Sequence, residues 1–241
     1  MGIIVFNNIS SRDIGIEVET FPSYSSPEKE YTVSHVVGRN GDIVVDTKTY
    51  KNVPRTYSIS VATYDKIEFY KKMNQVMEWL HSASGYARLE DSYESEFYRY
   101  AYFNRATVLN NILNGAGKAD IEFTCKPQRY YKSGEIPILF TASGQIQNEF
   151  INPAYPLLNI VTDNTYGNVT IGSHSFAINA ESGTHITVDC ELQDAYDGTV
   201  NKNNCIVLNG GEFPSIDPGL NDITFSGGIQ SVEVIPRWWT V

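Results

Sequence analysis

The sequence predicts a mainly β protein, with a first half made of strands and one α-helix and an antiparallel β-sandwich behind it. Three observations lead to this prediction. Apolar and polar residues alternate over several short segments, one segment repeats its apolar residues at helical spacing, and strand patterns recur at roughly ten-residue intervals in the second half. The chain has 241 residues, of which 41% are hydrophobic and 19% charged, so it can form one large domain or two small ones.

The first half contains one strong turn signal and three strand patterns. Asn40-Gly41 favours a two-residue hairpin turn, because both residues tolerate positive φ, and apolar residues flank it on both sides. Apolar residues alternate with polar ones over residues 55–61, 98–103 and 119–125. The sequence therefore predicts a hairpin around Asn40-Gly41 and three strands after it.

One helix is predicted over about 63–81, where the apolar spacing changes to three and four residues. Thr63 is the expected N-cap, and Gly85 lies just past the end. The apolar stripe consists of Ile67, Tyr70, Met73, Met77 and Leu80. A stripe of this kind is interpreted as core packing and not as a cofactor site.

The second half contains short strand patterns separated by turn residues. The predicted strands cover residues 157–161, 168–171, 174–178, 185–189, 204–208 and 223–225. Gly172-Ser173 is placed to close a hairpin between two of them. This pattern is typical of an antiparallel sandwich.

Charge is distributed unevenly between the two halves. Residues 1–140 contain 16 Lys/Arg and 17 Asp/Glu, whereas residues 141–228 contain Lys202 as their single basic residue and ten acidic ones. Such asymmetry suggests two separate domains. The small polar stretch Thr141–Asn148 is the expected linker, with a long surface loop inside one domain as the alternative. The lack of a basic surface in the second half argues against specific nucleic-acid binding.

Neither a disulfide framework nor a membrane span is expected. The cysteines Cys125, Cys190 and Cys205 are odd in number, widely spaced and without a Cys-x-x-Cys pair, and so they also argue against a zinc site. No run of about 18 apolar residues is present. The first residues lack the pattern of a signal peptide, so folding in the cytosol is expected.

The C-terminal segment is unusually apolar, since it places Trp238 and Trp239 next to Pro236 within the last six residues. A terminus of this composition needs to be covered by a core or an interface. The segment is therefore not expected to be a loose tail.

A set of short sequence motifs resembles those of the distal tail proteins of siphophages, which form the hub of the tail baseplate. In the first half the motifs are Asn40-Gly41, Trp79-Leu80, Gly85–Tyr93, Tyr98–Ala101 and Cys125–Tyr130. In the second half they are Asn152–Pro156, Val188–Tyr196, Phe213-Pro214 and Pro236–Trp239. The resemblance runs from end to end and in order.

The resemblance implies a fold and a role in assembly. It implies that residues 1–140, with residues 229–241 returning as a last strand, form the N-terminal ring-forming domain, a β-sandwich that carries the helix. Pro236, Trp238 and Trp239 would then pack between the domains. Residues 141–228 would form a galectin-like β-sandwich on the outside of the ring. The implied function is a structural virion protein without enzymatic activity or cofactor: a hexameric ring that joins the tail tube to the baseplate or tail tip. Truncation after Ile235 is then expected to destabilise the first domain more than the second.

The resemblance also implies partners and a location. The partners would be further copies of the chain, the tail tube protein, a tail-tip protein or tail-associated lysin, and receptor-binding or other baseplate proteins. DNA would pass through the ring without specific binding. The location would be the distal end of the virion tail, after synthesis and assembly in the bacterial host cytoplasm. At the hairpin tip, Arg39, Asn40, Gly41 and Asp42 are the candidates for contact with a neighbouring subunit.

Three alternatives stay open at the level of sequence. A carbohydrate-binding module for host cell-wall adsorption is the second functional hypothesis. Residues 141–228 lack Trp and Arg, however, and His174 and His185 do not match the galectin pattern. A glycosidase pair would come from the acidic residues Glu90, Asp91, Glu94 and Glu96, for which a solvated loop is the preferred interpretation. Weak candidates for calcium ligands are Asp189, Glu191, Asp194 and Asp197.

Overall fold

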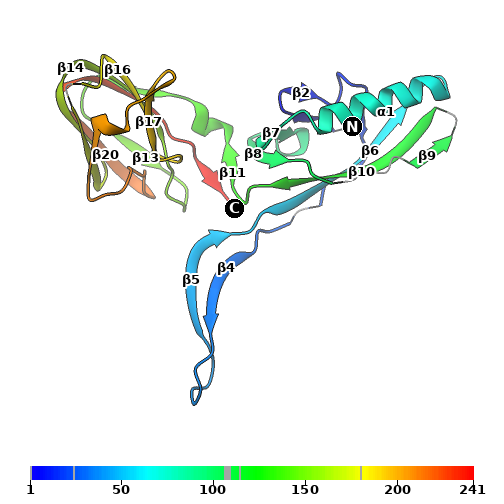
Figure 1. The fold of residues 1–241 in the computed structure, drawn as a ribbon, viewed down its shortest axis with the longest axis horizontal. Helices are drawn as coiled ribbons and strands as arrows, with labels where there is room; N and C mark the ends of the chain where they lie inside the picture. The colour runs from blue at the N-terminus through cyan, green and yellow to red at the C-terminus, as the bar shows by residue number, and fades with distance from the viewer. Residues whose placement is uncertain (1, 24, 106–109, 114, 180) are drawn as a thin grey trace. The chain divides into compact units, whose positions relative to one another are not determined.

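The computed structural model describes residues 2–23, 25–105, 110–113, 115–179 and 181–241. Its contacts divide the chain into two compact units: unit 1 consists of Met1–Arg129 with Val241, and unit 2 of Tyr130–Thr240. Both units are built from antiparallel β-sheet, and one α-helix lies in unit 1 (Figure 1). The predicted mainly β class with one helix is confirmed. None of the described residues forms a helix long and apolar enough to span a membrane.

Unit 1 is organised around one sheet in which the strands run in the order β2-β1-β7-β8-β10-β6-β3, with β9 paired to β10. The strands are β1 (Ile4–Phe6), β2 (Ile9–Ser10), β3 (Glu17–Val18), β6 (Val53–Ala62), β7 (Ala87–Asp91), β8 (Phe97–Tyr102), β9 (Asn110–Leu113) and β10 (Ala116–Cys125). The longest ladder joins β6 to β10 over ten residue pairs. Tyr57, Ile59 and Val61 are buried from β6, and Ile121 and Phe123 from β10, as the alternation predicts.

Helix α1 (Lys66–Leu80) covers one face of this sheet. Its N-cap is Asp65, whose carboxylate accepts hydrogen bonds from the backbone N–H groups of Ile67 and Glu68. The expected cap Thr63 instead donates its hydroxyl to the carbonyl of Gly115 at 2.9 Å. The helix therefore begins three residues later than predicted, because an aspartate two residues downstream satisfies the free N–H groups.

The buried face of α1 is rotated from the predicted stripe. Phe69, Val76, Trp79 and Leu80 are buried, whereas Ile67 is 71% exposed. Tyr70, the second residue of the predicted stripe, is also exposed. The indole N–H of Trp79 donates to the carbonyls of Phe6 and Ile9, both at 3.2 Å, and so anchors the end of the helix to the first strands. The predicted stripe therefore combined residues from two neighbouring faces of the helix, because apolar residues occur on both faces.

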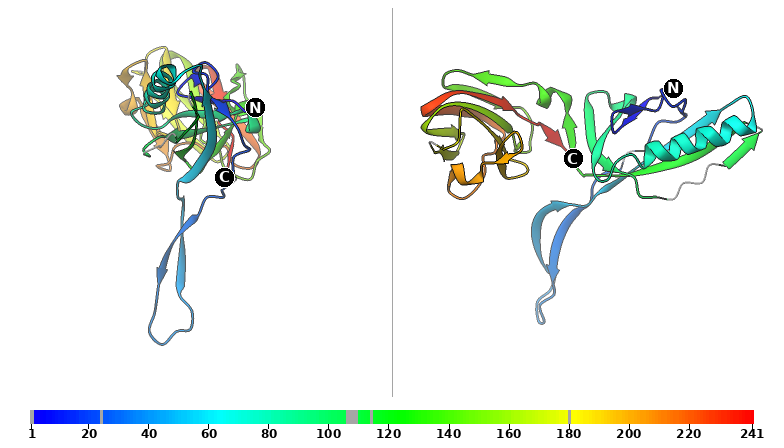
Figure 2. Two further views of the ribbon diagram at one scale, coloured as in Figure 1. Left: turned by 90° about the vertical axis from the view of Figure 1, so that its right-hand side faces the viewer. Right: turned by 45° about the horizontal axis from the view of Figure 1, so that its top comes forward.

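A second, separate element of unit 1 is the arm, which we define as β4 (Lys29–Ser34), β5 (Ile43–Tyr50) and the loop of residues 35–42 between them. These two strands form a sheet of their own. The arm leaves the rest of unit 1 as a thin two-stranded finger (Figures 1 and 2). The predicted hairpin is therefore present, but its connection is an eight-residue loop and not a two-residue turn.

Unit 2 is an antiparallel sandwich built on two long strands, β14 (Leu157–Ile171) and β20 (Gly219–Ile235). The other strands of the sandwich are β12 (Ile138–Phe140), β13 (Gly144–Asn148), β15 (His174–Ile178), β16 (His185–Asp189), β17 (Asp194–Asp197), β18 (Val200–Asn201) and β19 (Ile206–Asn209). The short strands β11 (Arg129–Tyr131) and β21 (Trp239–Thr240) pair with each other and are not part of this sheet. The beginning of β14 pairs with β16, and its end pairs with β15. β14 and β20 therefore run from one layer of the sandwich into the other.

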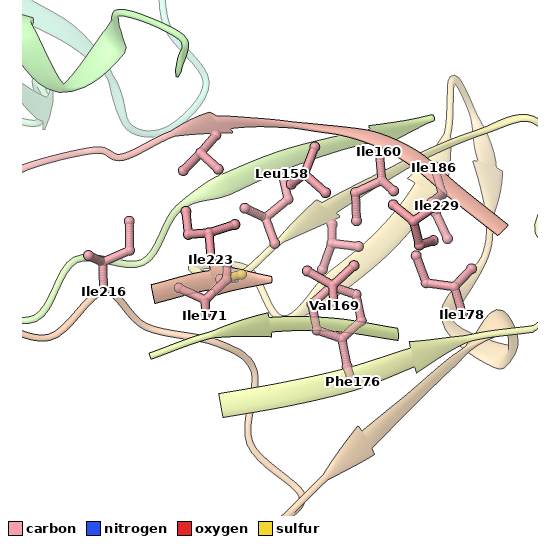
Figure 3. Packing of buried hydrophobic residues seen from close by; sticks show 14 of the residues in the cluster. Leu158, Ile160, Val169, Ile171, Phe176, Ile178, Ile186, Ile216, Ile223 and Ile229 are labelled. Atoms are coloured by element: carbon pink, nitrogen blue, oxygen red, sulfur yellow. The ribbon is translucent and has the colours of Figure 1, made fainter. Parts of the chain in front are cut away.

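The core of unit 2 lies between these two layers. Figure 3 shows Leu158, Ile160 and Ile186 from one layer packed against Val169 and Phe176 from the other. The predicted strands over 174–178 and 185–189 match β15 and β16, and Gly172-Ser173 closes the hairpin between β14 and β15. The two predicted strands over 157–161 and 168–171 are one continuous strand.

The bend in the long strands depends on glycine. Gly167 of β14 pairs with Gly227 of β20 at the point where the register shifts. Gly227 has a φ of +69°, and a Cβ on it would lie 2.3 Å from the carbonyl oxygen of Tyr166. A side chain cannot occupy that space, so the strand crosses between layers at residues that lack one.

The observed boundary between the units differs from the expected one. The stretch predicted as a linker contains β13, in which Ile146 and Asn148 are buried in unit 2. Residues 229–235 belong to β20, which pairs with β12 and β14. The contacts therefore group residues 130–140 and 229–240 with unit 2. The assignment of both segments to a ring-forming first domain stays a prediction. The sequence prediction missed strand β13, because residues 141–148 are mostly polar and the strand buries only alternate residues.

Candidate assembly interface

The arm exposes apolar side chains on both of its faces. Because paired residues of an antiparallel ladder share a face, the pair Val33 with Val44 lies on one face and the pair Thr32 with Val45 on the other. Tyr31 lies on the first face and Ile43 on the second. The exposed apolar residues of the two strands are Tyr31, Val33, Ile43, Val44 and Val45. Strand residues of this type normally pack against a neighbouring layer.

Two ion pairs lie at the root of the arm. The ammonium of Lys29 lies 2.6 Å from the carboxylate of Asp46, and that of Lys51 lies 2.9 Å from Glu28. Both pairs join the two sides of the arm where it meets unit 1. Such exposed pairs contribute little to stability, roughly 0–1 kcal/mol each, but they neutralise the charge of the root.

The loop at the tip contains the four residues that the sequence marks for contact with a neighbouring subunit. Gly38 and Gly41 adopt φ values of +85° and +80°, which favour glycine. The ring Nδ1 of His35 lies 3.0 Å from the carboxylate of Asp42. Residues 39–42 are all exposed. Their contact with another subunit stays a prediction.

A buried charge cluster lies in unit 1 beside the root of the arm. Arg55, the third residue of β6, donates to Asp91 at 3.0 Å and to Glu94 at 2.9 Å, and both of its partners are nearly buried. Arg99 and Arg129 donate to the same Glu94 carboxylate at 2.7 and 2.9 Å. Because removal of one partner leaves the others buried without compensation, such a network holds its members in place.

The charge cluster ties together segments that flank the arm. Arg55 follows β5 and also donates to the carbonyl of Ser23, which precedes β4, at 3.3 Å. Burial by itself would lower the pKa of Arg55, but Tyr57 and Asp91 raise the pKa above its ordinary value. Burial and the Asp91 carboxylate raise the pKa of the Tyr57 hydroxyl well above its ordinary value, so it stays protonated and donates to Asp91 at 2.7 Å.

This charge cluster replaces the solvated loop expected over Glu90–Glu96. The carboxylate of Asp91 accepts the backbone N–H groups of Tyr93 and Glu94 and so caps the short 3₁₀ helix η1 (Ser92–Glu94). Asp91 and Glu94 are held by arginines, and Glu90 is paired with Arg88. The sequence contains one indication of this cluster. Arg55 lies two residues before the buried Tyr57, so both side chains point to the same face of the strand.

The C-terminal segment is covered within unit 2. Trp238 is 8% exposed and belongs to the core of unit 2, where its ring lies 5.9 Å from that of Phe150. Trp239 donates its indole N–H to the carbonyl of Pro153 at 2.9 Å. Pro236 is buried as well. A Cβ on Gly134 would lie 2.4 Å from the backbone nitrogen of Trp238, so this glycine permits the close approach. The proposed packing of these residues between domains stays a prediction.

Arg237 fixes the C-terminal segment to Asp189. Its two terminal nitrogens donate to the two carboxylate oxygens of Asp189 at 2.7 and 2.9 Å, although the backbone of Arg237 has a φ of +57°. Burial by itself would raise the pKa of Asp189. The hydrogen bonds from Arg237 and from the backbone N–H of Leu192 nevertheless lower this pKa below its ordinary value. Asp189 is therefore ionised and paired at neutral pH.

The four weak calcium candidates are not gathered around one point. Asp189 is paired with Arg237, and Glu191 accepts the hydroxyl of Tyr130 at 2.7 Å. Asp194 accepts the side-chain amide of Asn203 at 2.7 Å, and Asp197 is exposed. Within the described ranges, no group of three or more His, Cys, Asp or Glu side chains is arranged to hold a metal ion.

The fold is shared with a class of solved structures from phage tails. The chain is similar to the SPP1 Dit (gp 19.1) protein, described as a paradigm of the hub adsorption apparatus in phages that infect Gram-positive bacteria. The two are 13% identical, the match covers 97% of this chain and 98% of that chain, and the TM-score is 0.74. The match therefore includes both units.

Two further similar chains come from the phage P2 baseplate in its activated conformation. In the structure with calcium, the identity is 11%, the match covers 97% of each chain and the TM-score is 0.56. In the structure with strontium, the identity is 12%, the coverage 97% and 96%, and the TM-score 0.55. Neither a protein-family model nor a curated protein sequence matches this chain. At these identities the likeness establishes the fold.

Proposed function

We propose that this chain is a structural subunit of a phage tail, with the role of a distal tail protein. Unit 1 assembles into a hexameric ring that joins the tail tube to the baseplate or tail tip. Unit 2 lies outside the ring and holds receptor-binding or other tip proteins. The chain acts as a non-enzymatic part of the virion, made and assembled in the cytoplasm of the bacterial host.

The arm is the observation that carries this proposal. It presents exposed Val33, Val44 and Val45 on a two-stranded sheet of its own. A free two-stranded hairpin is marginally stable in water, and exposed apolar strands invite association. The arm belongs to a chain whose fold is shared with a phage hub protein, and this supports a role of the arm in joining subunits. A ring requires two different and complementary surfaces on each subunit, and the arm can provide one of them.

The charge of the chain supports the remaining parts of the proposal. Unit 2 contains 3 Lys/Arg and 12 Asp/Glu, whereas unit 1 contains 15 and 16. A near-neutral unit can pack against copies of itself without strong repulsion, whereas a unit of net charge −9 repels its own copies. Neither balance attracts DNA, which suits a ring through which DNA passes.

The test is the mass and symmetry of the purified chain. Multi-angle light scattering is expected to find a particle of six times the 27.0 kDa chain, and negative-stain microscopy a six-fold ring. Where the chain alone is monomeric, addition of the tail tube and tail-tip proteins of the same phage is expected to close the ring. A chain that stays monomeric in both settings is not a ring subunit.

Deletion of Arg39–Asp42 tests the contribution of the arm tip. The deletion shortens the loop 35–42 and leaves both strands of the arm untouched, and it is expected to weaken ring formation. Removal of Gly211 from an exposed turn of unit 2 is the matched control and is expected to leave the ring intact. Full ring formation by the arm-tip deletion would show that the tip makes no contact between subunits.

A further inference from the structure

We propose that the outer half of the arm is inserted between unit 1 surfaces of neighbouring copies of this chain, so that both of its faces are buried in the ring. This inference rests on the proposed function and deepens it, because it names how the arm is held. A ribbon that lies on a surface buries one face, whereas an inserted ribbon buries two.

The distribution of apolar residues carries the inference. In an ordinary antiparallel sheet with one solvated face, apolar and polar residues alternate along each strand. In β5 the three consecutive residues Ile43, Val44 and Val45 are apolar, so the alternation is absent. Val44 is 58% exposed on one face and Val45 is 56% exposed on the other. Strands buried on both faces have continuous apolar runs of this kind.

The faces of the arm also differ along its length. The root carries the ion pairs Lys29–Asp46 and Lys51–Glu28, which suit a solvated position. The outer half carries Val33, Val44 and Val45 without a charged residue on the same stretch of strand. The part that needs cover on both faces is therefore the part farthest along the arm from its root.

Net charge indicates which surface receives the arm. The arm has no net charge, since Lys29, Arg39 and Lys48 are matched in number by Glu30, Asp42 and Asp46. Such an arm has no electrostatic preference for a strongly charged surface. Unit 2 has a net charge of −9, whereas unit 1 has a net charge of −1 and matches the arm. Unit 1 of a neighbouring copy is therefore the surface that fits.

Adjacent residues on opposite faces provide the test. Val44→Cys and Val45→Cys are prepared as separate full-length variants, and the rate of maleimide labelling is measured in the monomer and in the ring. The native thiols Cys125, Cys190 and Cys205 are buried, and burial raises the pKa of Cys125 to about 12, so background labelling is low. Val207→Cys is the matched control, because Val207 of unit 2 is 57% exposed.

Both arm cysteines are expected to react at the control rate in the monomer and at least roughly tenfold more slowly in the ring. The control is expected to react equally in both states. If one arm cysteine stays reactive in the ring, the arm lies on a surface and the inference is wrong, while the proposed ring stands. If both stay reactive, the arm is outside the interface and the inference is wrong as well.

A second measurement covers variants that disturb the ring. Val33→Thr with Val44→Thr changes one face, and Ile43→Thr with Val45→Thr changes the other, while threonine keeps the β-branched shape. Each pair is expected to raise the ring dissociation constant by roughly tenfold or more, since it removes apolar burial. An effect confined to one pair would contradict insertion. Absence of any ring from the unaltered chain, both alone and with the tail tube and tail-tip proteins, would instead contradict the proposed function.

Discussion

The arm and the C-terminal segment are both apolar stretches that need cover, and the structure treats them in opposite ways. Trp238 of the C-terminal segment is buried in the core of unit 2, and the side chains beside it are bonded to Pro153 and Asp189. Val33 and Val44 of the arm are exposed in a sheet that contains only the two arm strands. One apolar stretch is covered within its own unit, and the other is exposed.

The difference teaches where assembly and stability are encoded. Residues that find cover inside a unit contribute to its folding, whereas residues that find cover in a partner contribute to association. Composition alone does not separate the two cases, since both stretches are apolar. The separating feature is anchoring: the C-terminal segment has a bidentate ion pair and an indole hydrogen bond within unit 2, while the paired charges of the arm bond to the arm itself.

The largest effect is expected from truncation after Ile235. The truncation removes Trp238 from the core, the hydrogen bond of Trp239 and the partner of buried Asp189. We expect the free energy of unfolding of unit 2 to fall by about 5 kcal/mol or more, because a lost core tryptophan and an unpaired buried carboxylate add together. Hydrogen-exchange mass spectrometry measures the protection of each unit separately.

The same experiment decides between two roles of the C-terminal segment. Unit 1 loses Val241, whose carbonyl accepts a hydrogen bond from Arg129 at 3.2 Å, and its protection is expected to change less than that of unit 2. The sequence predicted the reverse, with the first domain losing more. Greater loss of protection in unit 1 would restore that prediction and would contradict the covering of the tryptophans by unit 2.

The regular strands and the fold class could be predicted from the sequence, because alternation reports burial directly. Tyr57, Ile59 and Val61 are buried as predicted, and the strand over 185–189 has the predicted ends. The turn at Gly172-Ser173 also follows from local chemistry. These features depend on residues that are close together in the sequence, so a single sequence is enough to predict them.

Features that depend on distant segments could not be predicted. Residues 157–171 form one strand across two layers only because Gly167 meets Gly227, sixty residues later. Glu94 is buried because arginines from β8 and β11 reach it, and Arg237 is paired through the fold with Asp189. The strand over 144–148 was missed for the same reason, since these polar residues form a strand only beside β20.

A smaller effect is expected from breaking the ion pair that anchors the C-terminal segment. Arg237→Gln is expected to lower the free energy of unfolding of unit 2 by about 3 kcal/mol at neutral pH, because Asp189 stays buried without a charged partner. Denaturant unfolding measures the change. Asp197→Asn is the control, because Asp197 is exposed, and is expected to change stability by less than about 0.5 kcal/mol.

The pH dependence of this effect checks its cause. The pKa of Asp189 in the folded state lies below its unfolded value, so the unfolded state binds the proton more readily. The stabilisation is therefore complete above the unfolded value of about 4 and is lost as the pH falls through the folded value. The difference between the original chain and Arg237→Gln is expected to shrink below about pH 4. A difference that is constant from pH 7 to pH 3 would exclude the ion pair as its source.

The smallest effect on stability is expected from the arm, although the expected effect on assembly is large. Val33→Thr with Val44→Thr removes apolar surface that is already solvated in the monomer, so little burial is lost on unfolding. We expect the free energy of unfolding of the monomer to change by less than about 0.5 kcal/mol. Thermal and denaturant unfolding at concentrations below ring formation measure it. A loss of about 2 kcal/mol or more would mean that the two valines are buried within unit 1, and the contrast between the arm and the C-terminal segment would then disappear.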